Sequence, residues 1–443
     1  MGRYGAILLV LTICVLTASL FLGSCRKLES ITPVAPAQTP GASTEKPISA
    51  KDAVPQKPPL PTGAELEKLL GLHSNRALGE HKFLILLADF PDVTRKYPET
   101  TLKNRIPAFL PGYFRDASYG LLELKADTTK RYMLPNPVTS YKISPANLEV
   151  DPRRVSALVT DAVNAADSDV QFSEDLYIIL ALGSTHEEFG MIGLCATPGM
   201  LGWQTSSAIK TRSGESVNNV AIFCENAHLG TYVHDTTHML GGVVNNKRMA
   251  PCLYDHDLQA KYLGIDNWPK VLINMGYWDP LSSHAPYKFE LPPSGFSSWT
   301  KMRLGWIGPS RLAAVNPSQD ATIRLDPLAD VNSTTVAIKI PLTSNTYYLI
   351  ENRQKVGSDV NLPTSGVLIL YADDTVDECR RGKAPVKIMD ANPDIPYLND
   401  ATYDMTRKRV FIDSARNLAI VLLQKVGQSY DIRVTTPDKA GNL

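Results

Sequence analysis

The sequence LGTYVHDTTHMLGG, residues 229–242, places two histidines four positions apart and ends in a pair of glycines. Residues four apart lie one above the other on a helix, so His234 and His238 can offer two imidazoles to one metal ion. Gly241 predicts the end of the helix within one turn of His238, which leaves a third ligand to the following loop. The segment therefore predicts a helix that carries part of a metal site.

The residues before this helix predict an α/β unit. Two runs, 83–88 and 176–182, are apolar on both faces and are typical of central strands. Between them, Asp151 is a good N-cap, and Pro152 suits the first position of a helix that reaches Ala166. Strand, helix, strand and histidine helix together place the site after the strands.

The character of the sequence changes beyond Pro309. Short apolar or alternating runs follow one another between turn residues, and residues 426–429 have the composition of a hairpin turn. We expect a C-terminal β-sandwich over residues 310–443. The runs that predict its strands are 346–351, 366–371, 418–423 and 430–434.

The N-terminus predicts export. Arg3 precedes an apolar run over 6–22, and the residues LGSC at 22–25 look like a bacterial lipobox. We expect residues 1–25 to be a signal peptide with Cys25 lipidated, or alternatively an uncleaved anchor helix. Both place the chain outside the cytoplasm, attached to a membrane. Residues 26–63 are rich in proline and small residues and predict a disordered spacer.

The composition bears on the expected partners and on the state of the cysteines. The 443 residues carry no formal net charge, and acidic and basic residues are interspersed, so nucleic acid is not an expected partner. Four cysteines fall in the folded part, where an oxidising compartment favours disulfides and an oxygen-free host favours buried thiols. They are Cys195, Cys224, Cys252 and Cys379.

Five further blocks surround the histidine helix, and together they resemble the immune inhibitor A family of secreted bacterial metalloproteases. FLILLADFPD at 83–92 resembles the family's opening strand, and YFRDASYG at 113–120 resembles its "YYRENSYG" segment. After the helix, WDPLS at 278–282 is similar to "WDLMS", WTKMRLGW at 299–306 to "W-x-K-x-x-LGW", and YLIENRQ at 348–354 to "YFLIENRQ". The resemblance covers nearly the whole folded chain.

The resemblance implies a zincin-type metalloprotease domain over residues 64–309, which hydrolyses peptide bonds in protein or peptide substrates. It assigns His234 and His238 as Zn²⁺ ligands and Asp235 as the general base. The family has glutamate where this chain has Asp235, a side chain one carbon shorter, which withdraws the carboxylate by about 1.5 Å. Such a displacement predicts attenuated hydrolysis.

The third metal ligand departs from the family as well. The family uses an aspartate in a "GLPDLYD"-like stretch, and alignment of its end places Cys252 at that position. Thiolate is a good zinc ligand. Asp255 is the second candidate, and His256 or Asp257 can also reach. Leu281 replaces the methionine beneath the metal and is expected to pack, as are Trp299 and Trp306, while Glu351 is expected to be a structural acid.

Two other acidic or histidine-containing segments are weaker candidates. The segment HEEFG at 186–190 lacks a second histidine at its fifth position, so we expect no zinc there. Asp89 and Asp92 follow a predicted strand and are most simply turn residues, although an acidic loop of this kind can also bind Ca²⁺.

Three functional hypotheses follow from these residues. The first is an active zinc endopeptidase, and the second is an inactive pseudoprotease that serves as a binding module at the cell surface. The third is another metal-dependent hydrolase of the His-Asp phosphohydrolase kind, against which the five blocks argue.

Overall fold

The structure, a computed structural model, describes residues 58–197, 208–287, 291–317 and 319–441. These residues belong to one compact unit, Val54–Leu443. The predicted signal peptide, Cys25 and the spacer up to residue 57 lie outside the described residues, so they stay predictions. None of the described helices combines the length and the apolar character needed to cross a bilayer.

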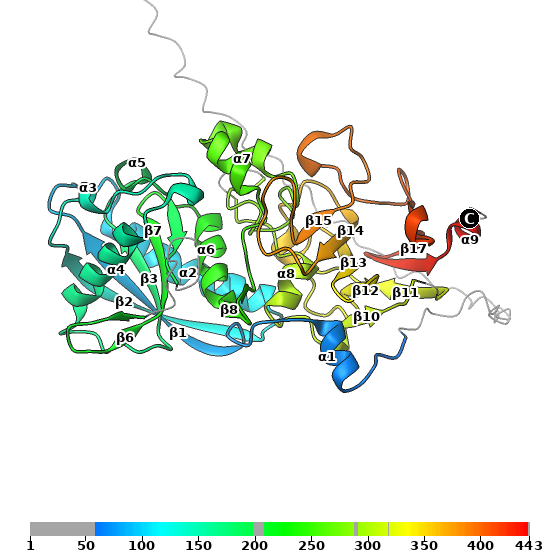
Figure 1. The fold of residues 1–443 in the computed structure, drawn as a ribbon, viewed down its shortest axis with the longest axis horizontal. Helices are drawn as coiled ribbons and strands as arrows, with labels where there is room; N and C mark the ends of the chain where they lie inside the picture. The colour runs from blue at the N-terminus through cyan, green and yellow to red at the C-terminus, as the bar shows by residue number, and fades with distance from the viewer. Residues whose placement is uncertain (1–57, 198–207, 288–290, 318, 442–443) are drawn as a thin grey trace, which may run out of the picture. The chain divides into compact units, whose positions relative to one another are not determined.

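The first half of the unit is built on a five-stranded sheet with the order β2-β1-β3-β7-β4 (Figure 1). Its first four strands are parallel, and the edge strand β4 runs antiparallel to β7. Both predicted central strands are present, and every residue of β3 and β7 is buried. The five strands are β1 (Gly79–Asp89), β2 (Leu122–Met133), β3 (Tyr177–Leu182), β4 (Gly193–Cys195) and β7 (Asn219–Cys224).

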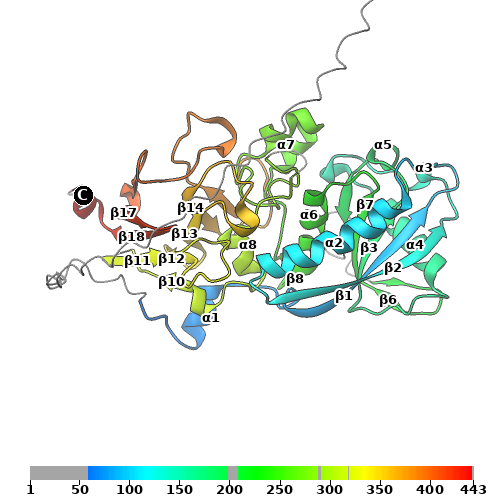
Figure 2. The ribbon, with the colours of Figure 1, turned by 180° about the vertical axis from the view of Figure 1, so that it is seen from behind.

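Helices cover both faces of this sheet (Figures 1 and 2). Phe83, Ile85 and Leu87 of β1 share a core with α2 (Glu99–Ala117) and α6 (Leu229–Gly241). The alternate residues of β1 pack in a second core with α4 (Pro152–Ala166). The α4 helix begins as predicted, because the Asp151 side chain accepts a hydrogen bond from the Arg153 amide.

The second half contains two further sheets. One has the order β10-β12-β13-β14-β15 and the other β11-β18-β17-β16, and their facing side chains form a shared core. The predicted hairpin is present, since Val426 and Ser429 pair across the turn between β17 and β18. The strands are β10 (Leu312–Ala314), β11 (Ala321–Leu325), β12 (Ala337–Pro341), β13 (Thr346–Arg353), β14 (Gly366–Asp373), β15 (Val386–Ile388), β16 (Val410–Asp413), β17 (Leu418–Val426) and β18 (Ser429–Thr435).

The largest hydrophobic core joins the two halves. It contains residues of the first sheet together with Leu349 and Leu368 of the second half, as well as the buried Trp299 and Trp306 that the sequence assigned to packing. The expected mixed α/β class is therefore confirmed, whereas the division at residues 309 and 310 stays a prediction.

The shorter elements are α1 (Ala64–Leu70), α3 (Val138–Tyr141), α5 (His186–Phe189), α7 (His256–Lys261), α8 (Ser298–Arg303), α9 (Pro437–Ala440), and the strand pairs β5 (Ile209–Lys210) with β6 (Ser216–Val217) and β8 (Val243–Val244) with β9 (Lys247–Arg248).

Candidate metal centre

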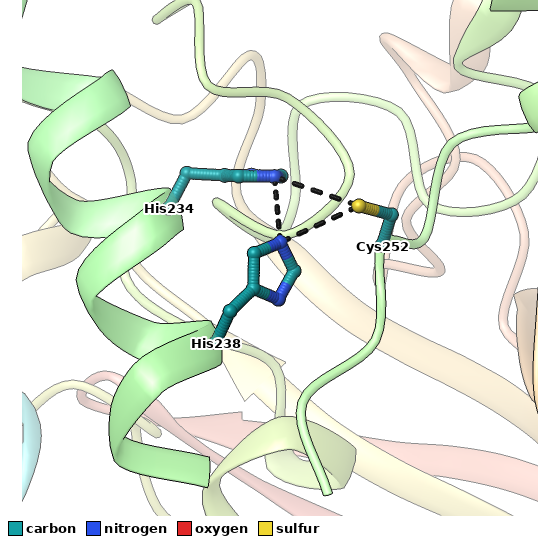
Figure 3. A group of neighbouring side chains, drawn as sticks. All are labelled: His234, His238 and Cys252. Atoms are coloured by element: carbon teal, nitrogen blue, oxygen red, sulfur yellow. Dashed lines mark hydrogen bonds between the residues drawn. The ribbon is translucent and has the colours of Figure 1, made fainter. Parts of the chain in front are cut away.

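The α6 helix presents both predicted histidines on one face. The His228 side chain caps its N-terminus, and the residues from Gly230 to Gly241 are all buried. The Nε2 atoms of His234 and His238 lie 2.9 Å apart, with their rings nearly perpendicular (Figure 3). The helix ends at Gly241, where a Cβ would lie 2.7 Å from the Cβ of Ala250. Glycine therefore permits the following loop to approach the histidines closely.

A short hairpin brings the third ligand to this pair. Strands β8 and β9 are joined by Asn245 and Asn246, both with positive φ as the tight turn requires. The chain then places the Cys252 Sγ 3.4 Å from the His238 Nε2 and 3.7 Å from the His234 Nε2 (Figure 3). Tetrahedral bonds of typical zinc-site length separate neighbouring ligand atoms by roughly 3.3 to 3.7 Å. Both distances to the Cys252 Sγ lie in this range, whereas the 2.9 Å between the two Nε2 atoms is shorter. All three ligand atoms lie within 4.8 Å of one another, so together they could hold one metal ion.

Backbone carbonyls orient both imidazoles. The Nδ1 of His234 lies 2.8 Å from the carbonyl oxygen of Pro280, and the Nδ1 of His238 donates to the carbonyl of Ala250. A proton on each Nδ1 leaves the lone pair of each Nε2 free to bind a metal ion between the two rings and Cys252. Burial also lowers the pKa of His234 to about 4, so its imidazole is neutral, as ligation requires.

The thiol of Cys252 depends on a cation for its ionisation. Burial raises its pKa to about 12, and its other close polar partner is the Tyr254 hydroxyl at 3.4 Å. A bound metal ion would reverse this preference, because it stabilises the thiolate directly. With a metal ion bound, the donor set would be two neutral imidazoles and one thiolate, and this group can bind a metal ion.

Asp255, the other predicted ligand, has a different set of contacts. Its carboxylate caps α7 by accepting hydrogen bonds from the amides of Asp257 and Leu258, and it also accepts one from Gly382. His256 packs its ring against Tyr254, and Asp257 pairs with Arg380. Of the candidates after Gly241, only Cys252 belongs to the group whose ligand atoms lie within 4.8 Å of one another.

Asp235, the predicted general base, lies against the edge strand. A Cβ on Gly193 would be 2.5 Å from its Oδ2, so only glycine leaves room for the carboxylate there. The Cys195 amide donates a hydrogen bond to it, while burial raises its pKa well above the usual range. Asp235 is not part of the close group formed by the two histidines and Cys252.

A cavity of about 740 Å³ adjoins the metal group. The edge strand β4 and the α6 helix line it, together with two histidines that the sequence did not single out, His228 and His284. The His284 ring packs edge-on against His234 with centroids 5.4 Å apart, and it also contacts His228 and Trp268. The sequence signal for His284 is its position two residues after the WDPLS block.

The weaker candidates of the sequence lie apart from this group. His186 hydrogen-bonds to Asn226. The Asp89 carboxylate pairs with Arg131 at 2.8 Å, and that of Asp92 accepts a hydrogen bond from the Val138 amide. Ca²⁺ binding at this loop stays a prediction. Leu281 is fully buried in the largest core, as expected for a packing residue.

The four cysteines in the described part of the chain occur as free, buried thiols, which is the second of the two alternatives for them. We expect Cys252→Ser to weaken Co²⁺ binding by more than roughly 100-fold, since even outer partners of metal ligands contribute about 10- to 100-fold. Titration of the metal-free protein with Co²⁺ measures this, through the sulfur-to-cobalt absorption in the near ultraviolet. Cys224→Ser is the matched control, because this buried thiol donates to the Met191 carbonyl and is not part of the metal group. An unchanged affinity and absorption in Cys252→Ser would remove the cysteine from the ligand set.

Neither a search against protein-family models nor a search of curated proteins found a match for this chain.

Proposed function

We propose that this chain is an exported zinc metalloendopeptidase of the immune inhibitor A type, with attenuated activity. One observation carries the proposal: His234, His238 and Cys252 converge on one point beside a cavity whose wall is an edge strand. A metal ion beside an open strand edge can activate water next to an extended peptide aligned on that edge.

Zinc is a metal that suits this donor set. Imidazole is a borderline ligand and thiolate a soft one, and Zn²⁺ binds both tightly; three protein ligands would leave a fourth position for water. Bound at this point, zinc would lower the pKa of that water and polarise the scissile carbonyl. Carboxylate-preferring ions such as Mg²⁺ and Ca²⁺ are poorly matched to two nitrogens and a sulfur.

The protein side chains then have separate tasks. Asp235 accepts the proton of the attacking water and passes it to the leaving amine nitrogen. The β4 strand is last in its sheet and, among the described residues, pairs only with β7, so its free edge can align a peptide by backbone hydrogen bonds. The carbonyls of Pro280 and Ala250 hold the two imidazoles in place.

The scaffold and the location belong to the same proposal. A mostly parallel sheet with an antiparallel edge strand, followed by a histidine helix, suits a zincin-type domain, and two sheets with a shared core suit a C-terminal β-sandwich. The lipobox at Cys25 and the Pro-rich spacer would hold this unit at the outer face of a membrane, where it meets protein or peptide substrates.

A pseudoprotease is the second candidate, and the position of Asp235 favours it. Its carboxylate is held against Gly193 by the Cys195 amide and stands outside the close ligand group. A base withdrawn from the attacking water would leave a protein that binds metal and peptide without turnover.

Zinc content and cleavage of an unfolded protein, measured on the purified full-length chain, separate the two. For the endopeptidase we expect about one zinc per chain and slow cleavage, and we expect His238→Ala to lose both because it removes one of three ligands. Arg153→Gln, a change at an exposed side chain of α4, is the control and should alter neither. Bound zinc without cleavage would favour the pseudoprotease, and absence of both would remove the metal centre from the proposal.

A further inference from the structure

One end of the cavity carries a fixed positive charge. Arg105 of α2 lines the cavity, and its Nη1 donates a hydrogen bond of 3.1 Å to the carbonyl oxygen of Ala227. Its guanidinium lies over the ring of Tyr232, 5.7 Å from the centroid. These two contacts hold the side chain beside the N-terminal end of α6, where the helix dipole adds to the positive potential.

No described side chain balances this charge. No described carboxylate lies within 4.0 Å of the Arg105 guanidinium, whereas Arg248, the other arginine of the cavity wall, pairs with Glu378 at 2.7 Å. Asp235 is the only acidic residue among the described residues that line the cavity, and it lies against β4. The half-buried Arg105 therefore retains donors for a ligand anion, and guanidinium binds carboxylate in a planar, two-point geometry.

The sheet register shows which part of a peptide this charge would meet. Gly193 of β4 is opposite Phe223, near the end of β7 that leads to Ala227, whereas Cys195 is opposite Ala221, farther from that end. A peptide pairing antiparallel with β4 runs from the Cys195 end toward the Gly193 end. Its residues on the C-terminal side of the metal-facing bond therefore approach Arg105.

We propose that Arg105 binds a carboxylate of the substrate, so that the cavity selects peptides with an acidic group on the C-terminal side of the scissile bond. This inference rests on the proposed peptidase function, because the position of the carboxylate is defined relative to the bond that is cleaved. Two sources of the carboxylate share the same chemistry, an Asp or Glu side chain and the free C-terminus of a short peptide. Arg105 is thus a residue that determines specificity and takes no part in the proton transfers.

Binding of labelled peptides tests this, measured by fluorescence anisotropy on the full-length chain with a chelator present. Removal of metal stops turnover and prevents a carboxylate from binding the metal instead. Four peptides of one sequence are compared, with Glu or Gln at the chosen position and with a free or an amidated C-terminus. We expect the preferred carboxylate to tighten binding roughly 10- to 100-fold, the range for hydrogen bonds to charged groups.

Three variants separate recognition from a structural role. Arg105→Gln should bind acidic and neutral peptides equally, and Arg105→Lys should keep part of the preference because it retains the charge without the planar fork. Arg153→Gln, at an exposed arginine of α4, should behave as the wild type. Equal melting temperatures of all variants show that any lost preference is not caused by unfolding.

The outcomes are distinct from those of the cleavage experiment. A Glu preference with either C-terminus assigns the carboxylate to a side chain, and a preference for the free C-terminus alone assigns it to the peptide end. Equal binding of all four peptides by the wild type, or a preference that survives Arg105→Gln, overturns the inference even if zinc-dependent cleavage is found. A preference without cleavage supports the inference while the peptidase function fails.

Discussion

Replacing Asp235 with glutamate should raise kcat/KM for peptide cleavage by roughly 100-fold, the factor that about 1 Å of misplacement costs. The aspartate carboxylate is held beside Gly193 by the Cys195 amide, outside the close ligand group. One additional methylene advances the carboxylate by about 1.5 Å, and Asp235 lines the cavity into which it would extend. Steady-state kinetics of the zinc-loaded proteins measure the effect.

Asp235→Asn is the control for this change, because it keeps the shape and removes the ability to accept a proton. We expect its cleavage to fall below that of the wild type while its zinc content stays the same. If the glutamate variant binds zinc and cleaves no faster than the wild type, the length of the side chain does not limit the reaction. A slow step elsewhere, or the pseudoprotease hypothesis, would then explain the low activity.

The elements that follow from local sequence were predicted well. The apolar strands β1 and β3, the α4 helix with its Asp151 cap and the histidine helix each result from periodicity or capping within one segment. The strands β4 and β7 were not predicted, although every residue of β7 is buried. A short apolar run has no period that separates a strand from a buried helix or loop.

The third metal ligand could not be chosen from the sequence alone. Cys252 and Asp255 lie three residues apart in one loop, and both are plausible ligands from their chemistry. What separates them is the β8–β9 turn, which fixes the direction of the loop, and the α7 helix, whose free amides take the Asp255 carboxylate. The contacts of His228, His284 and Arg105 with the cavity likewise come from segments far apart in the chain.

The turn that holds His234 is itself supported by buried charges. Arg353 donates to the carbonyl of Trp278, two residues before Pro280, and it pairs with Glu351 and Asp359. Asp279, in the same turn, accepts hydrogen bonds from Ser297 and the Thr300 hydroxyl. Glu351, which the sequence assigned to structure, thus belongs to a network that connects strand β13 with the metal centre.

Arg353→Met should destabilise the protein by about 3–5 kcal/mol, the range for breaking a buried ion pair from one side. The side chains of Arg353 and Glu351 are fully buried, and Asp359 is almost so. Loss of the guanidinium leaves two buried carboxylates without their cation, as well as the carbonyls of Trp278 and Gly295 without a donor. Chemical denaturation of the metal-free protein, followed by tryptophan fluorescence, measures the change in the free energy of unfolding.

Two further variants show whether unpaired charge is the cause. Adding Glu351→Gln and Asp359→Asn to Arg353→Met removes the stranded charges and should recover part of the lost stability. Arg433→Met breaks a partly exposed pair with Asp320, so it should cost less than about 1 kcal/mol. Equal costs for Arg353→Met and Arg433→Met would mean that the buried network contributes little. Because Arg353 supports the turn whose Pro280 carbonyl orients His234, the destabilised variant should also bind Co²⁺ more weakly than Arg433→Met does.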